Sequence, residues 1–426
     1  MKVEVKSRNL VKPATATPSH LRLYKISMID DLNPPIHVIR ILYYPPHSPT
    51  LNLEPSLAQI LPAFYPLAGR YLKHLHAVDC NDAGAHFSHA LVHSHLHHLL
   101  SDRAFPTSRL NALLPVAIAA ADGPADPMLA VQINTFLCGG VALAVCASHR
   151  IFDACSLNIF LAAWANAATG GQLTMRPDFS SPALFPSESA DPLEFGVGER
   201  RIVGRRIVFD KNAISRLRAH ADLDGGKTPS RVVAVSTALT QALLRADTDK
   251  REHEGGPARA ALITHAINVR ERTVPPVAKH ACGTWVSMSH VEIAAGERGI
   301  AERDFPKLVR KMREATVRGV EDCARILSER EFGRRVLVDS YAEIAEKGLR
   351  GDYKVIYVTD WSKFGDYELD FGIGKAVWVS LADVPLEDLM ILMNTRENDG
   401  IEAWVYLEES DMPYFQQDHH IQMLLA

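Results

Sequence analysis

An uninterrupted apolar run, Val141–Ala147, gives the strongest indication of how this chain folds. A strand with one face in water alternates apolar and polar residues, whereas a strand covered on both faces is apolar throughout. The residues that follow, Ser156–Ala168, favour a helix and carry apolar side chains at helical spacing. A strand buried on both faces and followed at once by a helix is typical of an α/β protein.

The length of the chain, 426 residues, exceeds what one hydrophobic core usually serves, so we expect two domains. Prolines, serines and acidic residues interrupt every pattern over residues 176–204. We therefore predict an N-terminal domain over residues 1–175, a linker over 176–204 and a C-terminal domain over 205–426. Strand and helix patterns occur in both halves, which favours two α/β domains. The polar residues 246–258 are expected to form a solvated loop.

Composition excludes several classes of protein. The formal net charge is −4, so the basic balance that nucleic-acid binding needs is missing. The six cysteines show no C-x-x-C spacing, which argues against a metal or redox site and fits a reducing compartment. The charged N-terminal segment lacks the apolar core of a signal peptide, and no run is long and apolar enough to span a bilayer. We expect a cytoplasmic protein that binds neither nucleic acid nor membrane.

The first candidate site is His149, which follows the buried strand, with Asp153 at the start of the next helix. The end of a strand that meets the start of a helix is a frequent place for chemistry in α/β proteins. A histidine with a pKa near 6.5 is suited to take and return a proton near neutral pH. The spacing alone is common by chance, and Asp153 is equally suited to cap the helix.

The second candidate site is the segment Asp370–Lys375, which reads Asp-Phe-Gly-Ile-Gly-Lys before a strand pattern. Gly372 and Gly374 flank one bulky apolar residue, which suggests a tight turn. The glycine spacing differs from that of a phosphate-binding P-loop.

Three weaker candidates have plain structural explanations. His89, His93 and His97 recur every four residues, which suits metal binding, but no carboxylate or cysteine joins them at ligand spacing, so we favour a polar surface helix and no metal. Cys155 near a helix start has the position of an activated nucleophile, and a buried small residue is the favoured interpretation. The third group, at the start of a predicted helix, suits phosphate binding or simple helix capping; it consists of Lys227, Ser230 and Arg231.

Taken together, the His149–Asp153 and Asp370–Gly374 motifs resemble those of the BAHD family of plant acyl-coenzyme A-dependent acyltransferases, H-x-x-x-D-G and D-F-G-W-G. Further segments resemble the family's F-Y-P-L-A-G-R, C-N-D, N-x-R and D-G-x-E-A stretches; they are Phe64–Arg70, Cys80–Asp82, Asn268–Arg270 and Asp399–Ala403. The similarity spans nearly the whole chain and is greatest to the branch of alkaloid acetyltransferases.

The resemblance implies two domains of the chloramphenicol acetyltransferase type, each with a mixed β-sheet and flanking helices, and an active-site channel at their interface. It implies that His149 is the general base, that Asp153 forms a structural ion pair with Arg270, and that Asp370 shapes its own loop. Acyl-coenzyme A, with acetyl-coenzyme A as the first donor to test, is then a co-substrate, and an alcohol or amine is the acceptor. Family membership further implies a monomer without a permanently bound cofactor.

Three departures from the family pattern affect the site. Ala154 replaces a glycine, at a cost of roughly 1 kcal/mol if the position needs a positive φ. Ile373 replaces the motif tryptophan; if that indole N–H stabilises the oxyanion, its loss costs on the order of 100-fold in rate. Thr284 stands where relatives often have asparagine, and its hydroxyl is a candidate oxyanion donor or pocket residue. The alternatives to a transferase are a non-catalytic accessory protein and a thioesterase.

Overall fold

The structure, a computed structural model, describes residues 1–46, 53–102, 105–173, 175–187, 200–221, 228–296 and 301–425. The chain divides into two compact units, and both combine segments that lie far apart in the sequence. The first unit comprises Met1–Phe195, Ala278–Trp285 and Phe364–Asp383; the second comprises Gly196–Val277, Val286–Lys363 and Val384–Ala426. The predicted boundaries therefore need correction, because residues 278–285 and 364–383 of the expected C-terminal domain belong to the first unit.

The first unit is built on a six-stranded sheet in which parallel and antiparallel neighbours are mixed. In spatial order its strands are β1 (Val3–Val11), β6 (Ala85–Val92), β7 (Leu129–Phe136), β8 (Val141–Ser148), β3 (His37–Tyr44) and β13 (Trp378–Ser380). A second, antiparallel sheet has the order β2 (Leu23–Lys25), β5 (Ala77–Asp79) and β4 (Arg70–Leu72).

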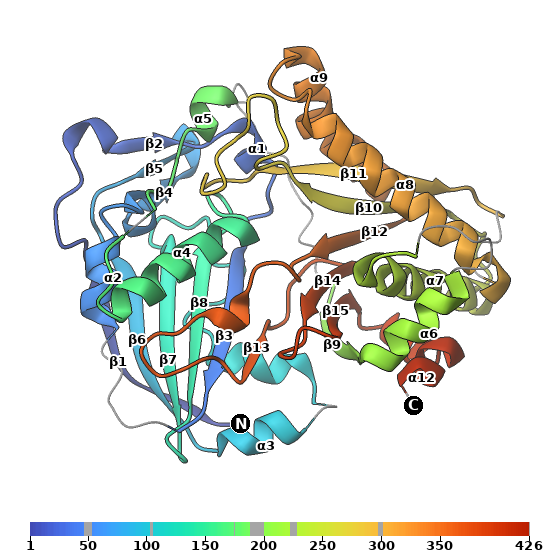
Figure 1. The fold of residues 1–426 in the computed structure, drawn as a ribbon, viewed down its shortest axis with the longest axis horizontal. Helices are drawn as coiled ribbons and strands as arrows, with labels where there is room; N and C mark the ends of the chain where they lie inside the picture. The colour runs from blue at the N-terminus through green and yellow to red at the C-terminus, as the bar shows by residue number, and fades with distance from the viewer. Residues whose placement is uncertain are drawn as a thin grey trace. The chain divides into compact units, whose positions relative to one another are not determined.

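Burial explains the apolar runs of the central strands. Every residue of β3 and β8 is buried, as the continuous run Val141–Ala147 predicted. The helix α4 (Ala154–Ala168) lies across the sheet and packs against α2 (Glu54–Ile60) and β3 (Figure 1). The other helices of this unit are short: α1 (Met28–Asp31), α3 (Leu96–Ser101) and α5 (Ser181–Leu184).

The second unit holds another six-stranded mixed sheet. Its strands, in spatial order, are β11 (Val286–Ile293), β10 (Ala260–Asn268), β12 (Tyr353–Asp360), β14 (Leu389–Asn394), β15 (Ile401–Glu408) and β9 (Ile202–Phe209). Its helices are α6 (Lys211–Ala221), α7 (Arg231–Glu254), α8 (Phe305–Cys323), α9 (Arg330–Arg334), α10 (Ser340–Arg350), α11 (Met412–Gln416) and α12 (His419–Leu425). Both units thus have the mixed α/β organisation expected from the sequence.

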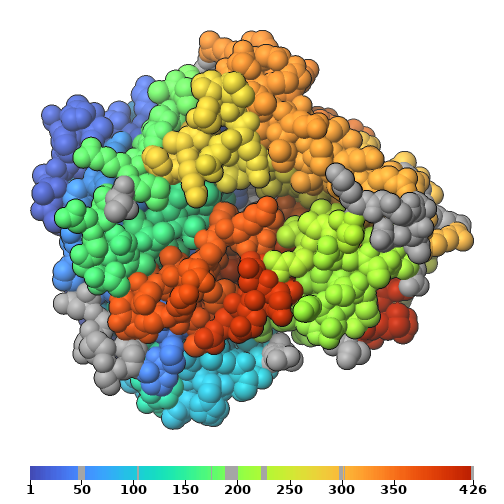
Figure 2. Space-filling model, in the orientation of Figure 1, coloured from blue at the N-terminus to red at the C-terminus, as the bar shows by residue number. Residues whose placement is uncertain are grey.

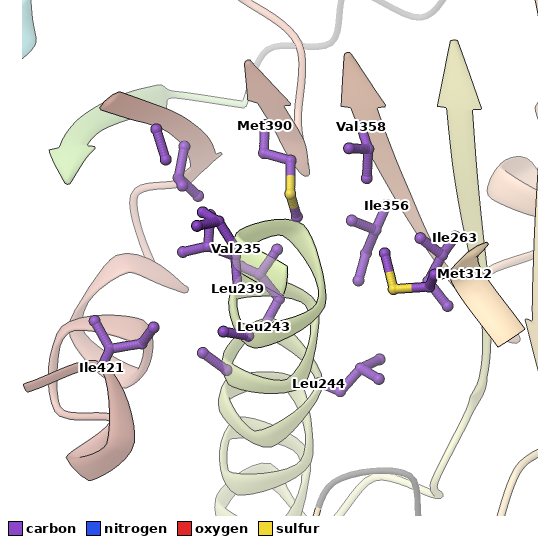
Figure 3. Close-up of a cluster of buried hydrophobic side chains, with 14 of the residues drawn as sticks. Val235, Leu239, Leu243, Leu244, Ile263, Met312, Ile356, Val358, Met390 and Ile421 are labelled. Atoms are coloured by element: carbon purple, nitrogen blue, oxygen red, sulfur yellow. The ribbon is translucent and has the colours of Figure 1, made fainter. Parts of the chain in front are cut away.

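The sheet of the second unit is covered on both faces. Figure 3 shows α7 packed on one face, where Leu239 and Leu243 meet Ile356, Val358 and other apolar side chains of the sheet. Leu262 and Val355 point to the opposite face and pack with Ile344 of α10. Alternate residues of β10 and β12 therefore serve two separate cores, as in a doubly covered sheet.

The predicted loop over residues 246–258 is wrong for its first nine residues, which continue α7 to Glu254. Two of their polar side chains form ion pairs with other segments: Asp247 pairs with Arg259, and Lys250 pairs with Asp411. Gly255, with φ 71°, ends the helix in the left-handed conformation that glycine favours. The polar residues of this segment thus lie on a helix, some of them ion-paired and others exposed to solvent.

The helix α8 is amphipathic. Phe305, Leu308 and Met312 are buried against the core, while charged residues on its other side face solvent and form part of the orange surface in Figure 2. Among the helices of the described segments, none has the length and apolarity that crossing a bilayer requires. All six cysteines are free thiols.

A buried histidine on β10 predicts an acid-sensitive fold. His265 is 8% exposed, and neither ring nitrogen has a hydrogen-bond partner among the described residues. Burial lowers its pKa from 6.5 to about 4. Because the unfolded chain takes up the proton first, this residue's share of the stability is complete above pH 6.5 and is lost as the pH falls toward 4, in total roughly 3 kcal/mol.

The variant His265→Phe, which keeps a ring but cannot titrate, should remove this loss. Unfolding free energies of wild type and variant, measured in urea between pH 7 and 4, should diverge by about 1.4 kcal/mol per pH unit at the steepest point. The buried carboxyl groups of Asp30 and Asp388, with pKa values raised by burial to about 6, respond in the opposite sense but cancel in the comparison. A constant difference across this range would show that His265 does not stay neutral.

Candidate active site

The main chain at His149 is held firmly on both sides. His149 N donates to Ile36 O at 2.9 Å, and His149 O accepts from Asn33 Nδ2 at 3.0 Å. The next residue, Arg150, is 3% exposed and makes a double hydrogen bond to Asp122, with distances of 2.9 and 2.7 Å. These contacts fix the main chain at the end of the buried strand, and thereby the position from which the His149 imidazole projects.

The imidazole of His149 is half-buried, and its Nδ1 atom is buried without a hydrogen-bond partner in the described residues. Burial lowers the pKa of His149 below 6.5; the residue's own main chain and, to a smaller extent, the negative charge of Asp153 oppose that shift only in part. The ring is therefore neutral at pH 7, which is the state a general base needs.

Asp153 is the N-cap of α4, the simpler of the two roles weighed from the sequence. Its Oδ1 accepts from Ser156 N at 2.7 Å and from Ser156 Oγ at 2.8 Å, while Oδ2 accepts from Trp285 N at 3.2 Å. The carboxylate is 4% exposed. Asp153 thus joins the start of α4 to the segment Ala278–Trp285, which returns to this unit from the second half of the chain.

Gly283 completes this junction. Ser156 Oγ accepts from Gly283 N at 3.2 Å and also lies 2.9 Å from Gly283 O. Gly283 has φ 119°, and a Cβ there would lie 2.7 Å from Ser181 Oγ, so only glycine fits. Sequence reasoning missed Ser156 and Gly283 as site residues, because each looks like an ordinary helix or turn residue when taken alone.

Arg270, expected to pair with Asp153, belongs to the second unit and is 4% exposed. Asn268 Oδ1 accepts from Arg270 N and from Arg270 Nη1, both at 3.1 Å. The asparagine of the N-x-R segment therefore orients the arginine. The ion pair between Arg270 and Asp153 stays a prediction.

Asp370 shapes its own loop, as expected. Its Oδ1 accepts from the backbone N–H groups of Gly372, Ile373 and Gly374 at 2.8, 3.0 and 2.9 Å. Gly372 and Gly374 have φ values of 89° and 88°, which glycine adopts without strain. The Ile373 side chain is half-buried and offers no hydrogen-bond donor, and its backbone N–H already serves Asp370.

Thr284 is 1% exposed and lies in a buried polar network. Its N donates to Asp30 Oδ1 at 2.7 Å, and its hydroxyl oxygen lies 2.5 Å from Asn33 Nδ2. The contact with Asn33 gives the Thr284 hydroxyl a structural partner, and its expected role as an oxyanion donor stays a prediction. Asp30 and Asn33 did not figure among the sequence candidates, although the Asn-Pro-Pro pattern after a short helix signals a rigid turn.

The candidates for coenzyme A contact are partly committed to the protein. Ser230 caps α7 by accepting from Val233 N at 3.2 Å. Arg231 donates to Asn398 O at 2.6 Å and to Asn394 Oδ1 at 3.3 Å. Lys227 lies outside the described residues. The structure therefore gives Ser230 and Arg231 structural partners, and their contact with coenzyme A stays a prediction.

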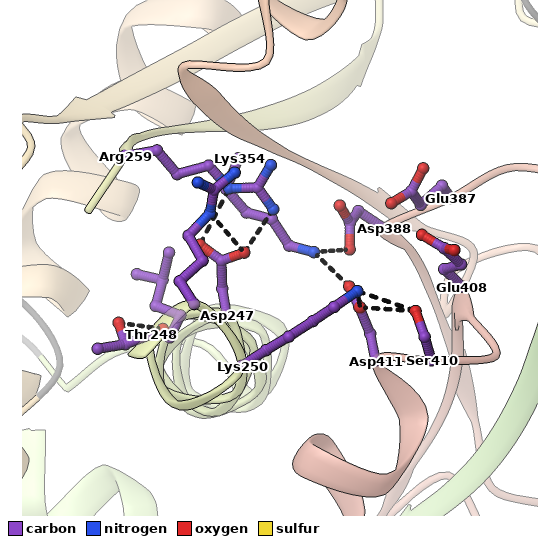
Figure 4. Close-up of polar contacts among 12 residues, drawn as sticks. Asp247, Thr248, Lys250, Arg259, Lys354, Glu387, Asp388, Glu408, Ser410 and Asp411 are labelled. Carbon is purple, nitrogen blue, oxygen red and sulfur yellow. Dashed lines mark hydrogen bonds and ion pairs between the residues drawn. The ribbon is translucent and has the colours of Figure 1, made fainter. Parts of the chain in front are cut away.

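The sequence analysis predicted that the histidine cluster His89, His93 and His97 holds no metal. The surface helix predicted for these histidines is wrong: His89 lies in the strand β6, His93 follows that strand and His97 lies in the short helix α3. His89 and His93 are paired with glutamates, Glu54 at 3.3 Å and Glu4 at 3.0 Å. Within the described ranges, one group of side chains brings three possible ligand atoms together: Glu387, Asp388 and Asp411. Figure 4 shows that the ammonium group of Lys354 already lies against two of these carboxylates, which gives them a cationic partner from the protein itself.

Removing the Asp153 carboxylate should cost stability as well as activity. Asp153→Ala leaves the buried N–H groups of Ser156 and Trp285 without their acceptor, so we expect a loss of about 2–4 kcal/mol in unfolding free energy. The matched control is Ser230→Ala, which removes the cap of α7 at an exposed site and should cost about 1 kcal/mol. Equal melting temperatures for Asp153→Ala and wild type would contradict this structural role.

Comparison with known proteins gives the class. A family model described as the Transferase family matches residues 1–422. The chain is 34% identical over 438 residues to the pelargonidin 3-O-(6-caffeoylglucoside) 5-O-(6-O-malonylglucoside) 4'''-malonyltransferase of Salvia splendens, with 100% of both chains covered. It is 31% identical to the vinorine synthase of Rauvolfia serpentina, with 96% of this chain and 95% of that one covered.

Solved structures agree with this class. The crystal structure of vinorine synthase matches with a TM-score of 0.81 and 30% identity, over 97% of this chain and 96% of that chain. A TRI101 structure from F. sporotrichioides, complexed with coenzyme A and T-2, has a TM-score of 0.72 over 94% of this chain and 98% of that chain, at 19% identity, and shows the shared fold. Fold and relatives together define an acyltransferase. The chain belongs to the Transferase family, the BAHD acyltransferases, which confirms the resemblance seen in the sequence.

Proposed function

We propose that this protein is an acyl-coenzyme A-dependent O- or N-acyltransferase that acts on an alcohol or amine of plant specialised metabolism. The observation that carries the proposal is His149, whose imidazole lies on a firmly held main chain and whose Nδ1 has no hydrogen-bond partner among the described residues. Relatives named for malonyl and acetyl transfer support the reaction class.

The proposed reaction needs no acyl-enzyme. The neutral His149 ring takes the proton of the acceptor hydroxyl or amine while the oxygen or nitrogen bonds to the thioester carbonyl carbon. The carbon–sulfur bond then breaks, and the imidazolium returns the proton to the thiolate, which leaves as coenzyme A. The acyl thioester is a co-substrate in this scheme, and no permanently bound cofactor or metal takes part.

The proposal is tested by measuring thiol release from a panel of acyl-coenzyme A donors, including the acetyl and malonyl thioesters, with and without pooled alcohol and amine acceptors. Release that depends on an acceptor supports the transferase and ranks the donors. Release without any acceptor would show a thioesterase instead.

A second candidate, a non-catalytic member of the family that binds its ligands without turnover, is favoured by Ile373, which supplies no donor in place of the motif tryptophan. Binding of coenzyme A by calorimetry, together with no release for any donor and acceptor, would support this candidate. The proposal also includes a cytoplasmic monomer, which gel filtration and fractionation of plant tissue would test.

A further inference from the structure

We propose that Asn33 is a positioning residue for the reaction, because its single amide group fixes both the main chain of His149 and the hydroxyl of Thr284. This inference rests on the proposed function, in which His149 is the general base. Asn33 is 5% exposed and follows the short helix α1.

The chemistry of the partners settles which end of the Asn33 amide points at them. A carbonyl oxygen only accepts hydrogen bonds, so the atom 3.0 Å from His149 O is the amide nitrogen of Asn33. The same nitrogen lies 2.5 Å from Thr284 Oγ, and it can only donate. The Thr284 hydroxyl must therefore accept from Asn33, and its own hydrogen points away from that nitrogen.

The segment that carries Asn33 is rigid. Pro34 and Pro35 follow it, and each proline ring fixes its own φ. Ile36 O accepts from His149 N at 2.9 Å, and Asn33 O accepts from Arg150 Nη1 at 2.9 Å. Residues 33–36 thus meet residues 149–150 through three hydrogen bonds, of which the Asn33 side chain supplies one.

Asp30, at the other end of the hydrogen-bond network formed by Asn33 and Thr284, is also held by several hydrogen bonds. Asp30 is fully buried and accepts from Thr284 N at 2.7 Å through Oδ1, while its Oδ2 accepts from Ser27 N and Ser27 Oγ at 3.0 and 2.7 Å. Asn33 therefore links three separate pieces of the first unit: the segment after α1, the turn at His149 and the returning segment Ala278–Trp285.

Loss of the amide should displace the base without removing it. Displacements of about 1 Å cost on the order of 100-fold in rate when reacting groups must meet in one geometry. We expect Asn33→Ala to lower kcat by about 10- to 100-fold while KM for the acyl donor changes less than about threefold.

A matched control separates positioning from general damage to the core. Asn134 is another buried asparagine of the same unit, and its Nδ2 also donates to main-chain carbonyls, Leu113 O at 2.9 Å and Ala142 O at 3.2 Å. Asn33→Ala and Asn134→Ala should lower the melting temperature by similar amounts. At a temperature where both are folded, only Asn33→Ala should lose kcat; equal losses in both would overturn the inference.

Variants of Thr284 provide a second test that keeps Asn33 and can be used if Asn33→Ala does not fold. Thr284→Val keeps the shape but removes the hydroxyl, and Thr284→Ser restores the hydroxyl, so the serine variant should recover most of the kcat that the valine variant loses. The double variant Asn33→Ala, Thr284→Val should lose less than the product of the single losses, since both act through one network. Valine and serine variants with the same kcat would overturn the link to Thr284.

The design keeps this inference apart from the proposed function. Wild type without acceptor-dependent release, or full activity in His149→Ala, refutes the transferase itself. A His149-dependent transferase in which Asn33→Ala keeps its wild-type kcat refutes only the role of Asn33.

Discussion

Replacement of His149 by alanine should lower acceptor-dependent thiol release by about 10²- to 10⁴-fold, the range that a positioned general base contributes. The fold should survive, because the stabilising contacts at this position use the main chain: His149 N meets Ile36 O, and His149 O meets Asn33. The ring Nδ1 has no partner to lose within the described residues. Initial rates and melting temperatures of the same preparations would test both halves of this prediction.

A pH profile strengthens the test of His149. Because burial lowers the pKa of the imidazole below 6.5, the base stays unprotonated into mildly acid solution. The acid limb of kcat/KM should therefore have an apparent pKa below 6.5. An acid limb centred above that value would mean that a different group is the base.

The buried histidine of the second unit provides the control. The variant His265→Phe also removes a buried imidazole. His265 lies in the second unit and takes no part in the proposed chemistry. It should keep its wild-type kcat. If His149→Ala keeps wild-type turnover, the proposed mechanism is wrong, whatever happens in the control.

The sequence predicted correctly those strands and helices that are buried along most of their length. The run Val141–Ala147 became β8, and Ser156–Ala168 became most of α4, because a strand or helix enclosed by protein needs apolar side chains all along its length. His149 and Asp153 could be placed for the same reason, since both lie in the turn between these two elements.

The boundaries between the two units could not be predicted from the sequence. The strand β13 has three residues and pairs with β3 more than 300 positions earlier, with Trp378 opposite Tyr43. A strand so short leaves no periodic pattern, and its partner is chosen by tertiary packing. The same holds for Gly283, which belongs to the first unit through Ser156 and not through any local signal.

The residues around His149 that escaped prediction are linked across long stretches of sequence. Asn33 meets His149 and Thr284 at separations of 116 and 251 residues. Asn33 and Asp30, which the sequence analysis missed, are polar residues of a type that is common on protein surfaces. Only their burial in one hydrogen-bond network gives them a role at the site. A single sequence records the residue types but not the distances among them.

A large loss of stability is expected from a change in the second unit, in the polar cluster of Figure 4. Lys354 is 2% exposed, and its ammonium nitrogen lies 2.6 Å from Asp388 Oδ1 and 3.2 Å from Asp411 Oδ2. Asp411 has a second cationic partner, Lys250, whereas Lys354 is the lysine that contacts Asp388. Burial would raise the pKa of Asp411, but these two lysines lower it.

Lys354→Met should destabilise the fold by about 3–5 kcal/mol, because it leaves the buried carboxyl group of Asp388 without its cation. The control is Lys347→Met: Lys347 pairs with Glu292 and Glu343 at 3.1 and 3.0 Å, but both carboxylates are about half exposed, so the loss should stay below about 1 kcal/mol. Urea unfolding of the two variants beside wild type measures the difference.

The pH dependence of that loss identifies its cause. Burial raises the pKa of Asp388 to about 6 even with Lys354 present, and removal of the lysine raises it further. A neutral carboxyl group no longer needs the cation, so the destabilisation by Lys354→Met should be large at pH 8 and smaller at pH 5. Asp388→Asn added to Lys354→Met should restore part of the stability at pH 8, since asparagine tolerates the left-handed backbone there, φ 55°. A loss that is the same at both pH values, and that the second substitution does not relieve, would mean that Lys354 stabilises the fold through its packed aliphatic chain and not through its charge.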